Sequence, residues 1–423
     1  MQNRRWTTVL LWAIILGASG CAQPLTEEQI IARAEAVHAR AVTLDSHVDI
    51  TGPYYATEEL DPGTDHPKLK CDLVKMRRGG MDGVFLAVYV RQRPQLDAQG
   101  YEKAQEIARQ KFDAIRRLTD AMYPDRCELA TSADDVQRIV ETGKKAIIIG
   151  MENGYPIGQD LSLLKRYYDL GARYITLCHT GHNQICDSSG PKKPLHNGLS
   201  QFGKKVIARM NRLGIICDAS HISEKSFFDL IEVTKAPIIA SHSGCHALHP
   251  HNRNLTDEQL KALKKNGGVI QVVTVDSFLK AETPQRKEAV EQLRKEFNLP
   301  TQQQRREMSA EQLEALRPKL DEYFDRYIEI SARFPVAALA DYVDHIDHAV
   351  KTAGIDHVGI GTDFDGGGGV VGFNNHAEAL NVTVELVRRG YSNEDIVKIW
   401  GGNLLRVWRQ VEKAAAKLQR QDQ

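Results

Sequence analysis

The chain has 423 residues, 55 of them basic and 55 acidic, so its formal net charge is zero. A hydrophobic share of 42% is ordinary for a globular protein, and the length suits one large domain or two smaller ones. The chain has neither a basic excess nor a basic cluster, so we expect no nucleic-acid partner.

The N-terminus has the pattern of a bacterial export signal. Arg4 and Arg5 precede an apolar run over 9–16, and small residues then lead to Cys21. The run is shorter than the roughly 20 apolar residues that a membrane-spanning helix needs. The segment "LGASGC" is similar to a lipobox, in which the cysteine carries a lipid. We therefore predict a signal peptide over 1–21 and an exported, lipid-anchored cell-envelope protein, periplasmic or at the cell surface. A plain secretory peptide is the alternative.

Eight short β-rich runs follow, most of them continuously apolar, as expected for strands buried on both faces of a parallel sheet. They lie at 41–49, 81–90, 145–152, 172–179, 214–221, 236–243, 267–275 and 357–366. Amphipathic helical patterns separate many of them, at 102–122, 160–171, 199–214, 223–233 and 256–267. Gly171 and Gly214 predict helix C-caps, and Thr256 with Gln259 predicts a capping box.

The alternation of eight strands with helices predicts a (β/α)8 TIM-type barrel. A charged, helical segment at 276–336, between the seventh and eighth runs, is interpreted as an insertion packed on the barrel. We expect an N-terminal tether and helix at 22–40, the barrel domain at 41–410 and a C-terminal tail at 411–423. Six further cysteines form no CxxC motif, and no pairing is predicted.

Active sites of such barrels lie at the carboxyl ends of the strands, and six of the eight predicted strands end in a residue that can titrate or bind metal. These residues are His47 and Asp49, Glu152, His179, His221, His242, and Asp363 and Asp365. A single histidine after an apolar run is more often a packed residue than a ligand, but the joint pattern indicates a metal centre. Histidine, aspartate and glutamate suit Zn²⁺, Mn²⁺, Co²⁺ or Ni²⁺.

The number of candidate ligands favours two ions. Five ligands around a central carboxylate are too many for one catalytic zinc, which typically keeps three protein ligands and an open position. Two ions about 3.5–4 Å apart, bridged by Glu152, would use all five. Four histidines crowd into 242–251, but only His242 ends an apolar run. We therefore expect His246, His249 and His251 to lie in the following loop.

From about residue 41 to 408, the chain resembles the membrane dipeptidase (renal dipeptidase) family of zinc metallopeptidases, which have amidohydrolase-like barrels. The resemblance rests on motifs that occur in order, among them "LDSHVD", "LGARYITLCH", "GLSQFGKKVIARMNRLGIICDASHIS", "PIIASHSGCHALHPHNRNLTDEQLKAL" and "DHVGIGTDFDG". It implies a site of two zinc ions, one held by His47, Asp49 and Glu152 and the other by Glu152, His221 and His242.

The resemblance also implies roles for three further residues. His179 binds the substrate around the scissile bond and steadies the tetrahedral intermediate. Arg253 pairs with the free carboxylate of the substrate, for which its planar fork is suited. Asp363 moves the proton from the attacking hydroxide to the leaving amine.

The implied reaction is hydrolysis of dipeptides with a free C-terminal carboxylate, by a hydroxide that bridges two zinc ions. The family resemblance extends this to D-residues at the C-terminal position and to β-lactams, and it implies a homodimer. Two alternatives stay open. One is another binuclear amidohydrolase, acting on N-acyl amino acids or cyclic amides, and the other is an inactive peptide-binding lipoprotein.

Overall fold

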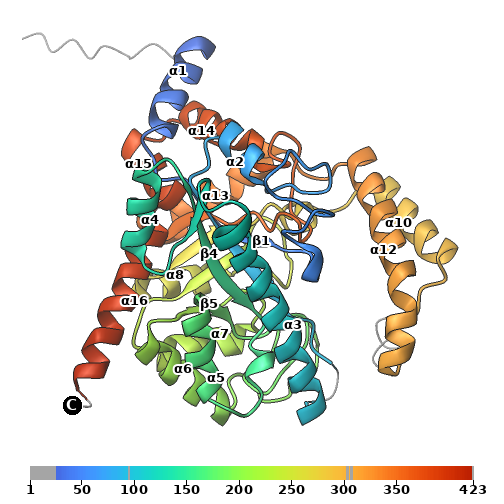
Figure 1. Cartoon of the computed structure of the whole chain (residues 1–423). Coiled ribbons are helices and arrows are strands. Elements are labelled where there is room, and N and C mark those ends of the chain that lie inside the picture. The colour runs from blue at the N-terminus through green and yellow to red at the C-terminus, as the bar shows by residue number, and fades with distance from the viewer. Residues whose placement is uncertain (1–24, 94–95, 302–303, 305–307, 422–423) are drawn as a thin grey trace, which may run out of the picture.

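The computed structural model describes residues 25–93, 96–301, 304 and 308–421, and its centre is a parallel sheet surrounded by helices (Figure 1). Eight strands pair in chain order. They are β1 (Leu44–Asp49), β2 (Gly83–Tyr89), β4 (Lys145–Glu152), β5 (Ala172–Thr176), β6 (Ile216–Asp218), β7 (Ile239–Ser243), β8 (Val269–Val272) and β9 (Val358–Ile360). Each predicted run contains one of these strands, so the predicted barrel is confirmed.

The sheet closes into a barrel where the residues after β9 meet the end of β1. The backbone N–H of Asp363 donates to the carbonyl of His47 at 2.9 Å, and that of Asp49 donates to the carbonyl of Phe364 at 2.9 Å. Two segments at opposite ends of the chain therefore lie side by side. Both segments carry site residues that the sequence predicts.

One short strand was not predicted. β3 (Cys127–Leu129) pairs in parallel with the beginning of β4, before the pairing of β4 with β5 starts. Its three residues include a glutamate and form no apolar run, so the sequence pattern carries no strand signal there.

Helices cover the outside of the barrel (Figure 1). Those before β8 are α1 (Glu27–His38), α2 (Leu73–Arg78), α3 (Ala98–Arg116), α4 (Ala133–Glu141), α5 (Ser162–Leu170), α6 (Gln201–Leu213), α7 (Glu224–Val233) and α8 (Asp257–Asn266). Gly171 and Gly214 cap α5 and α6 in the left-handed conformation, at φ 113° and 80°. Thr256 and Gln259 form the capping box of α8. These three predicted helix ends are confirmed.

The predicted helical insertion between the seventh and eighth barrel strands is also present. It contains α9 (Asp276–Leu279), α10 (Pro284–Glu296) and α12 (Ala310–Arg333), and α13 (Leu339–Ala353) then returns the chain to the barrel. Figure 1 shows α10 and α12 side by side, projecting away from the barrel, so the prediction that the insertion packs on the barrel is wrong for these two helices. A small apolar cluster that includes Leu293, Phe297 and Tyr323 holds the two helices together.

The last helices are α14 (Ala379–Arg388), α15 (Asn393–Val397) and α16 (Asn403–Arg420). α16 runs across the predicted boundary at residue 410, and its Val411 is buried. Trp408 of α16 lies 5.7 Å from the ring of Phe85, and Phe85 lies 5.4 Å from the ring of Tyr174. These aromatic side chains form a packed floor below the carboxyl ends of the strands.

The predicted signal peptide and the predicted lipidation site at Cys21 lie outside the described residues. Within the described ranges, no helix combines the length and the apolar character needed to cross a membrane. The six cysteines in those ranges are buried free thiols.

Candidate active site

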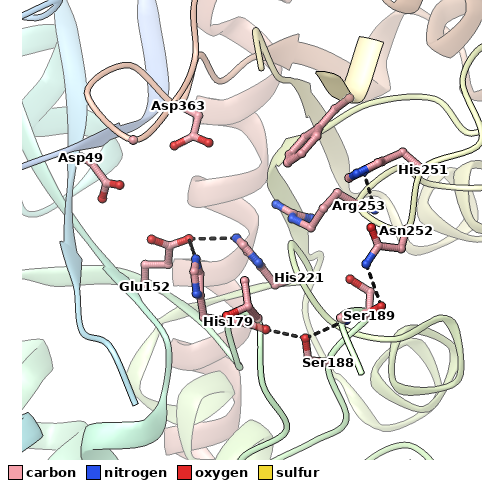
Figure 2. Close-up of a pocket in the computed structure, with 14 residues that line it drawn as sticks. Asp49, Glu152, His179, Ser188, Ser189, His221, His251, Asn252, Arg253 and Asp363 are labelled. Carbon is pink, nitrogen blue, oxygen red and sulfur yellow. Dashed lines mark hydrogen bonds and ion pairs between the residues drawn. The ribbon is translucent and has the colours of Figure 1, made fainter. Parts of the chain in front are cut away.

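A pocket opens at the carboxyl ends of the barrel strands, and its two sides differ in chemistry (Figure 2). We call one side the acidic wall. It consists of Asp49, Glu152, His179, His221 and Asp363, which line the pocket, together with His47 and His242, which contact Glu152. We call the other side the loop wall, which consists of Ser188, Ser189, His251, Asn252, Arg253 and Phe278. Figure 2 shows the two carboxylates Asp49 and Asp363 at one side, with Arg253 facing them across the pocket.

Glu152, at the end of β4, lies at the centre of the acidic wall. One of its carboxylate oxygens, Oε1, is 3.0 Å from His221 Nε2, 3.4 Å from His242 Nε2 and 3.7 Å from His179 Nε2. The other, Oε2, is 3.7 Å from His47 Nε2. Four imidazoles from four different strand ends therefore surround one buried carboxylate, as the strand positions in the sequence had suggested.

Several nitrogen and oxygen atoms of this wall that could bind a metal ion lack the hydrogen bonds expected of buried polar atoms. Among the described residues, His47 Nε2 and Asp49 Oδ1 are buried and have no hydrogen-bond partner. His221 Nε2 and His242 Nε2 lie only 2.9 Å apart, where two neutral ring nitrogens would repel unless a cation or proton lies between them. Buried polar atoms are rarely left unpaired in proteins. The arrangement therefore fits a bound cation.

The described residues contain three overlapping groups whose ligand atoms lie within 4.8 Å of one another. They are His47 with Glu152 and His242, Glu152 with His179 and His221, and His47 with Asp49 and Asp363. All seven predicted metal or catalytic residues of the strand ends are thus brought together. His179 and Asp363 join the candidate groups, and how the ligands divide between two ions stays a prediction.

Electrostatics supports the same conclusion. Burial and the neighbouring carboxylates of Asp49 and Asp363 raise the pKa of Glu152 well above its ordinary value. Burial raises the pKa of Asp49 to about 6, and burial together with Asp49 raises the pKa of Asp363 well above its ordinary value. Burial lowers the pKa of His47 and of His179 to about 3. Neutral imidazoles are the form of histidine that binds metal, and a cation among the crowded carboxyl groups would favour their ionised form.

A second layer of buried groups orients two of these histidines, and the sequence prediction missed it. His47 Nδ1 lies 2.7 Å from Tyr174 Oη, and His242 Nδ1 lies 2.8 Å from Ser241 Oγ. Ser241 in turn donates to Asp218 Oδ2 at 2.6 Å. With Nδ1 donating to these oxygens, each Nε2 presents its lone pair to the centre of the site.

Asp45 provides the second missed support. Its carboxylate accepts hydrogen bonds from the backbone N–H of His47 at 3.1 Å and of Thr362 at 2.9 Å, and it lies 2.8 Å from His376 Nε2. It thereby fixes β1 against the segment after β9. The sequence does contain a signal for these supporting residues. Asp45 in "TLDSHVD" and Asp218 in "IICDASH" are acidic residues inside otherwise apolar strand runs.

Two acidic-wall residues have unusual backbone geometry. His221 and Asp363 adopt the left-handed region, at φ 71° and 60°, which costs energy for residues with a side chain. Gly366 packs so closely behind Asp363 and Asp49 that a Cβ there would collide with both carboxylates. The position of Asp363 is thus set by tight packing of the loop after β9.

The loop wall carries Arg253, the residue predicted to bind a substrate carboxylate. Its Nη2 donates to the carbonyl of His242 at 3.0 Å, and its Nε is buried without a hydrogen-bond partner among the described residues. Ser189 Oγ, on the same wall, is likewise buried and unpaired in the described structure. Donors in this state are available to a ligand that brings acceptor oxygens.

The structure separates the four clustered histidines. His242 reaches the centre, whereas His246 and His249 lie on the loop that follows β7 and do not line the pocket. His251 does line it, with its ring 4.4 Å from that of Phe278. Asp365, which also ended a predicted strand, does not line the pocket, because its carboxylate accepts from the backbone N–H of Lys70 at 2.7 Å.

Comparison with known sequences places the chain among dipeptidases. It matches the family model described as membrane dipeptidase, peptidase family M19, over residues 31–422. It is 33% identical to dipeptidase tcpJ of Claviceps purpurea over 350 residues, which cover 82% of this chain and 70% of that protein. It is 31% identical to dipeptidase aclJ of Aspergillus oryzae over 395 residues, covering 91% and 81%.

Solved structures give the same result. The probable dipeptidase PvdM from Pseudomonas aeruginosa superposes with a TM-score of 0.80 at 33% identity, covering 92% of this chain and 100% of that one. A metallo peptidase from Rhodobacter sphaeroides, liganded with a phosphinate mimic of the dipeptide L-Ala-D-Ala, superposes with a TM-score of 0.69. It covers 88% of this chain and 99% of that one at 22% identity, which shows a shared fold.

Proposed function

Because the chain belongs to the membrane dipeptidase family, peptidase family M19, we propose that it hydrolyses dipeptides that carry a free C-terminal carboxylate, using two zinc ions. The observation that carries the proposal is the position of Glu152. Its carboxylate lies within 3.0–3.7 Å of four imidazole nitrogens, in a pocket that Arg253 also lines. The pocket thus combines a cation site with a cationic side chain for an anionic substrate.

In this proposal, His47, Asp49 and Glu152 hold one zinc ion, and Glu152, His221 and His242 hold the other. The unpaired Nε2 of His47 and Oδ1 of Asp49 support their place in the ligand set. Bound zinc supplies a water of lowered pKa and polarises the carbonyl of the scissile bond. Manganese, cobalt or nickel would suit the same donors.

The chain's own groups handle charge and protons. His179 lies beside Glu152 on the pocket surface, where its ring N–H can donate to the carbonyl oxygen as negative charge develops there. Asp363 accepts the proton of the attacking water and returns it to the leaving amine. Burial and the neighbouring Asp49 raise the pKa of this carboxyl, which favours its uptake of a proton. Arg253 pairs with the substrate carboxylate and so fixes the distance to the scissile bond.

The test uses purified protein and a panel of dipeptides, N-acyl amino acids and one tripeptide. Hydrolysis of dipeptides, loss of activity after chelation and recovery with two equivalents of zinc are expected. Activity that survives thorough metal removal would overturn the mechanism. Faster turnover of N-acyl amino acids than of dipeptides would favour an amidohydrolase with a different substrate. The panel includes L-Ala-D-Ala and a β-lactam, because the family resemblance extends the proposal to both.

We also propose that the chain is exported and anchored by a lipid on Cys21, as the lipobox-like segment before it supports. Expression of the full chain in a bacterium, followed by detergent phase partition, tests this. The wild-type protein is expected in the detergent phase, and a Cys21→Ser variant in the aqueous phase. The molecular mass of the purified protein, measured by analytical ultracentrifugation, tests the homodimer that the resemblance implies.

A further inference from the structure

Phe278 stands out in a polar pocket. Among the described residues that line it, Phe278 alone contributes a large hydrocarbon side chain, and it lies on the loop wall. Its ring is 5.6 Å from the guanidinium carbon of Arg253 and stacks on the ring of His251 at 4.4 Å and 23°. An apolar surface therefore lies directly beside the side chain proposed to bind the substrate carboxylate.

The carboxylate of a C-terminal residue is one bond away from its Cα. When Arg253 pairs with that carboxylate, the side chain on the same Cα lies within reach of Phe278. Contact with an aromatic ring removes apolar surface from water, so this geometry favours substrates with an apolar C-terminal side chain over glycine.

Three contacts hold the short helix that carries Phe278. Asn254 Nδ2 donates to the carbonyl of Phe278 at 2.6 Å, and His345 Nε2 lies 3.0 Å from the carbonyl of Leu279. At the other end of α9, Asp276 forms an ion pair with Arg286 of the insertion, whose Nη2 lies 3.3 Å from Asp276 Oδ1. The first contact comes from the loop between β7 and α8, the second from α13 and the third from α10 of the insertion.

Arg286 lies on α10, which projects away from the barrel, and yet only 1% of its surface is accessible to solvent. Besides Asp276, its guanidinium contacts Tyr327 Oη at 3.1 Å and Glu282 Oε1 at 3.3 Å. A buried charge needs such partners, and removing one of them is costly. The ion pair thus connects α10 and α12 to α9, two residues before Phe278.

We propose that Phe278 selects dipeptides with an apolar C-terminal side chain, and that Arg286 of the insertion positions Phe278 through Asp276. The proposal rests on the proposed dipeptidase function and names its substrate class. It assigns the insertion a part in specificity, although α10 and α12 themselves do not line the pocket among the described residues.

The first test compares kcat/KM for L-Ala-L-Leu with that for L-Ala-Gly. The wild-type protein is expected to prefer the leucine dipeptide. Phe278→Ala should reduce the preference about tenfold, mainly through KM, because loss of one apolar contact surface costs about that much discrimination. Phe278→Leu should retain most of it. A wild-type protein that hydrolyses both equally, or an unchanged ratio in Phe278→Ala, overturns the inference. If the wild-type protein hydrolyses no dipeptide, the proposed function itself fails.

The second test concerns Arg286. Arg286→Gln should lower the same preference several-fold, and Arg286→Lys should restore part of it, while Arg294→Gln, an exposed change on the same helix, should leave it unaltered. An unchanged preference in a folded Arg286→Gln protein removes the positioning role. If that variant does not fold, Asp276→Asn gives the same comparison from the other side of the ion pair.

Discussion

The two walls of the pocket are built in different ways. The acidic wall comes from the ends of barrel strands, and buried side chains behind it, among them Asp45, Tyr174 and Asp218, orient its histidines and its backbone. The loop wall comes from segments beyond the strands, held by contacts between loops, such as that of Asn252 Nδ2 with the carbonyl of Ser189 at 2.8 Å.

This difference separates two tasks. A metal centre needs several ligands within tenths of an ångström, which a rigid barrel end provides. Substrate recognition tolerates variation, and loops can change without disturbing the barrel. We therefore expect changes in the acidic wall to affect all substrates alike, and changes in the loop wall to affect substrates according to their C-terminal residue.

The largest effect is expected from Glu152→Gln. The change removes the central charge that four imidazoles face, so metal content should fall and kcat should drop by about 10³-fold for every dipeptide. Metal analysis and steady-state kinetics measure both. Glu106→Gln, an exposed change on α3, is the matched control. Full activity of Glu152→Gln with normal metal content would contradict the central role of this residue.

Arg253→Ala should lower kcat/KM for dipeptides about 100-fold, because the substrate carboxylate would lose its buried cationic partner. Dipeptide amides, which lack that carboxylate, should be affected far less. Arg253→Lys should recover only part of the loss, since a lysine cannot form the bidentate pair. Equal losses for dipeptides and their amides would assign Arg253 to the metal centre rather than to substrate binding. That result would contradict the expectation that the loop wall serves substrate recognition.

Ser241→Ala tests the layer behind the acidic wall. Its hydroxyl lies between His242 Nδ1 and Asp218, so its loss should weaken zinc binding by about 10- to 100-fold while leaving the fold intact. Competition with a chromophoric chelator measures the affinity. Ser331→Ala, in α12 of the insertion, serves as control. An unaltered affinity would mean that the ligands are held in place without this hydrogen bond.

The smallest effect concerns pH. Burial raises the pKa of Asp49 to about 6, so in the metal-free protein this carboxyl holds a proton at pH 5 and has lost it at pH 7. The pKa values of His47 and His179, lowered to about 3, leave both rings neutral over this range. Zinc binding should therefore weaken by about tenfold in total as the pH falls from 7 to 5, as expected for one proton displaced from a group with a pKa of about 6. Calorimetry in two buffers counts the protons released, and a pH-independent affinity without proton release would contradict the expectation.

The barrel and most of the acidic wall were predictable because the sequence signals are local. A strand buried on both faces reads as an apolar run, and a polar residue at its carboxyl end, such as Glu152 or His242, marks the active end of a barrel. The second layer was not predicted, because Asp45 and Asp218 lie inside runs in which the apolar residues are the signal for a strand. Phe278 was missed because a single aromatic residue at the start of a charged insertion carries no signal of its own.

The sequence by itself determined the order of strands, the residues at their ends and, through the family motifs, the expected chemistry. Only the tertiary structure decided which of these residues meet. Barrel closure sets the segment after β9 against β1, so that Asp363 lies in one group with His47 and Asp49. Tertiary packing also places Phe278 against Arg253, which lies 25 residues earlier in the chain. It links the insertion to the loop wall through the ion pair between Arg286 and Asp276. Such contacts depend on how distant segments pack, which no local pattern encodes.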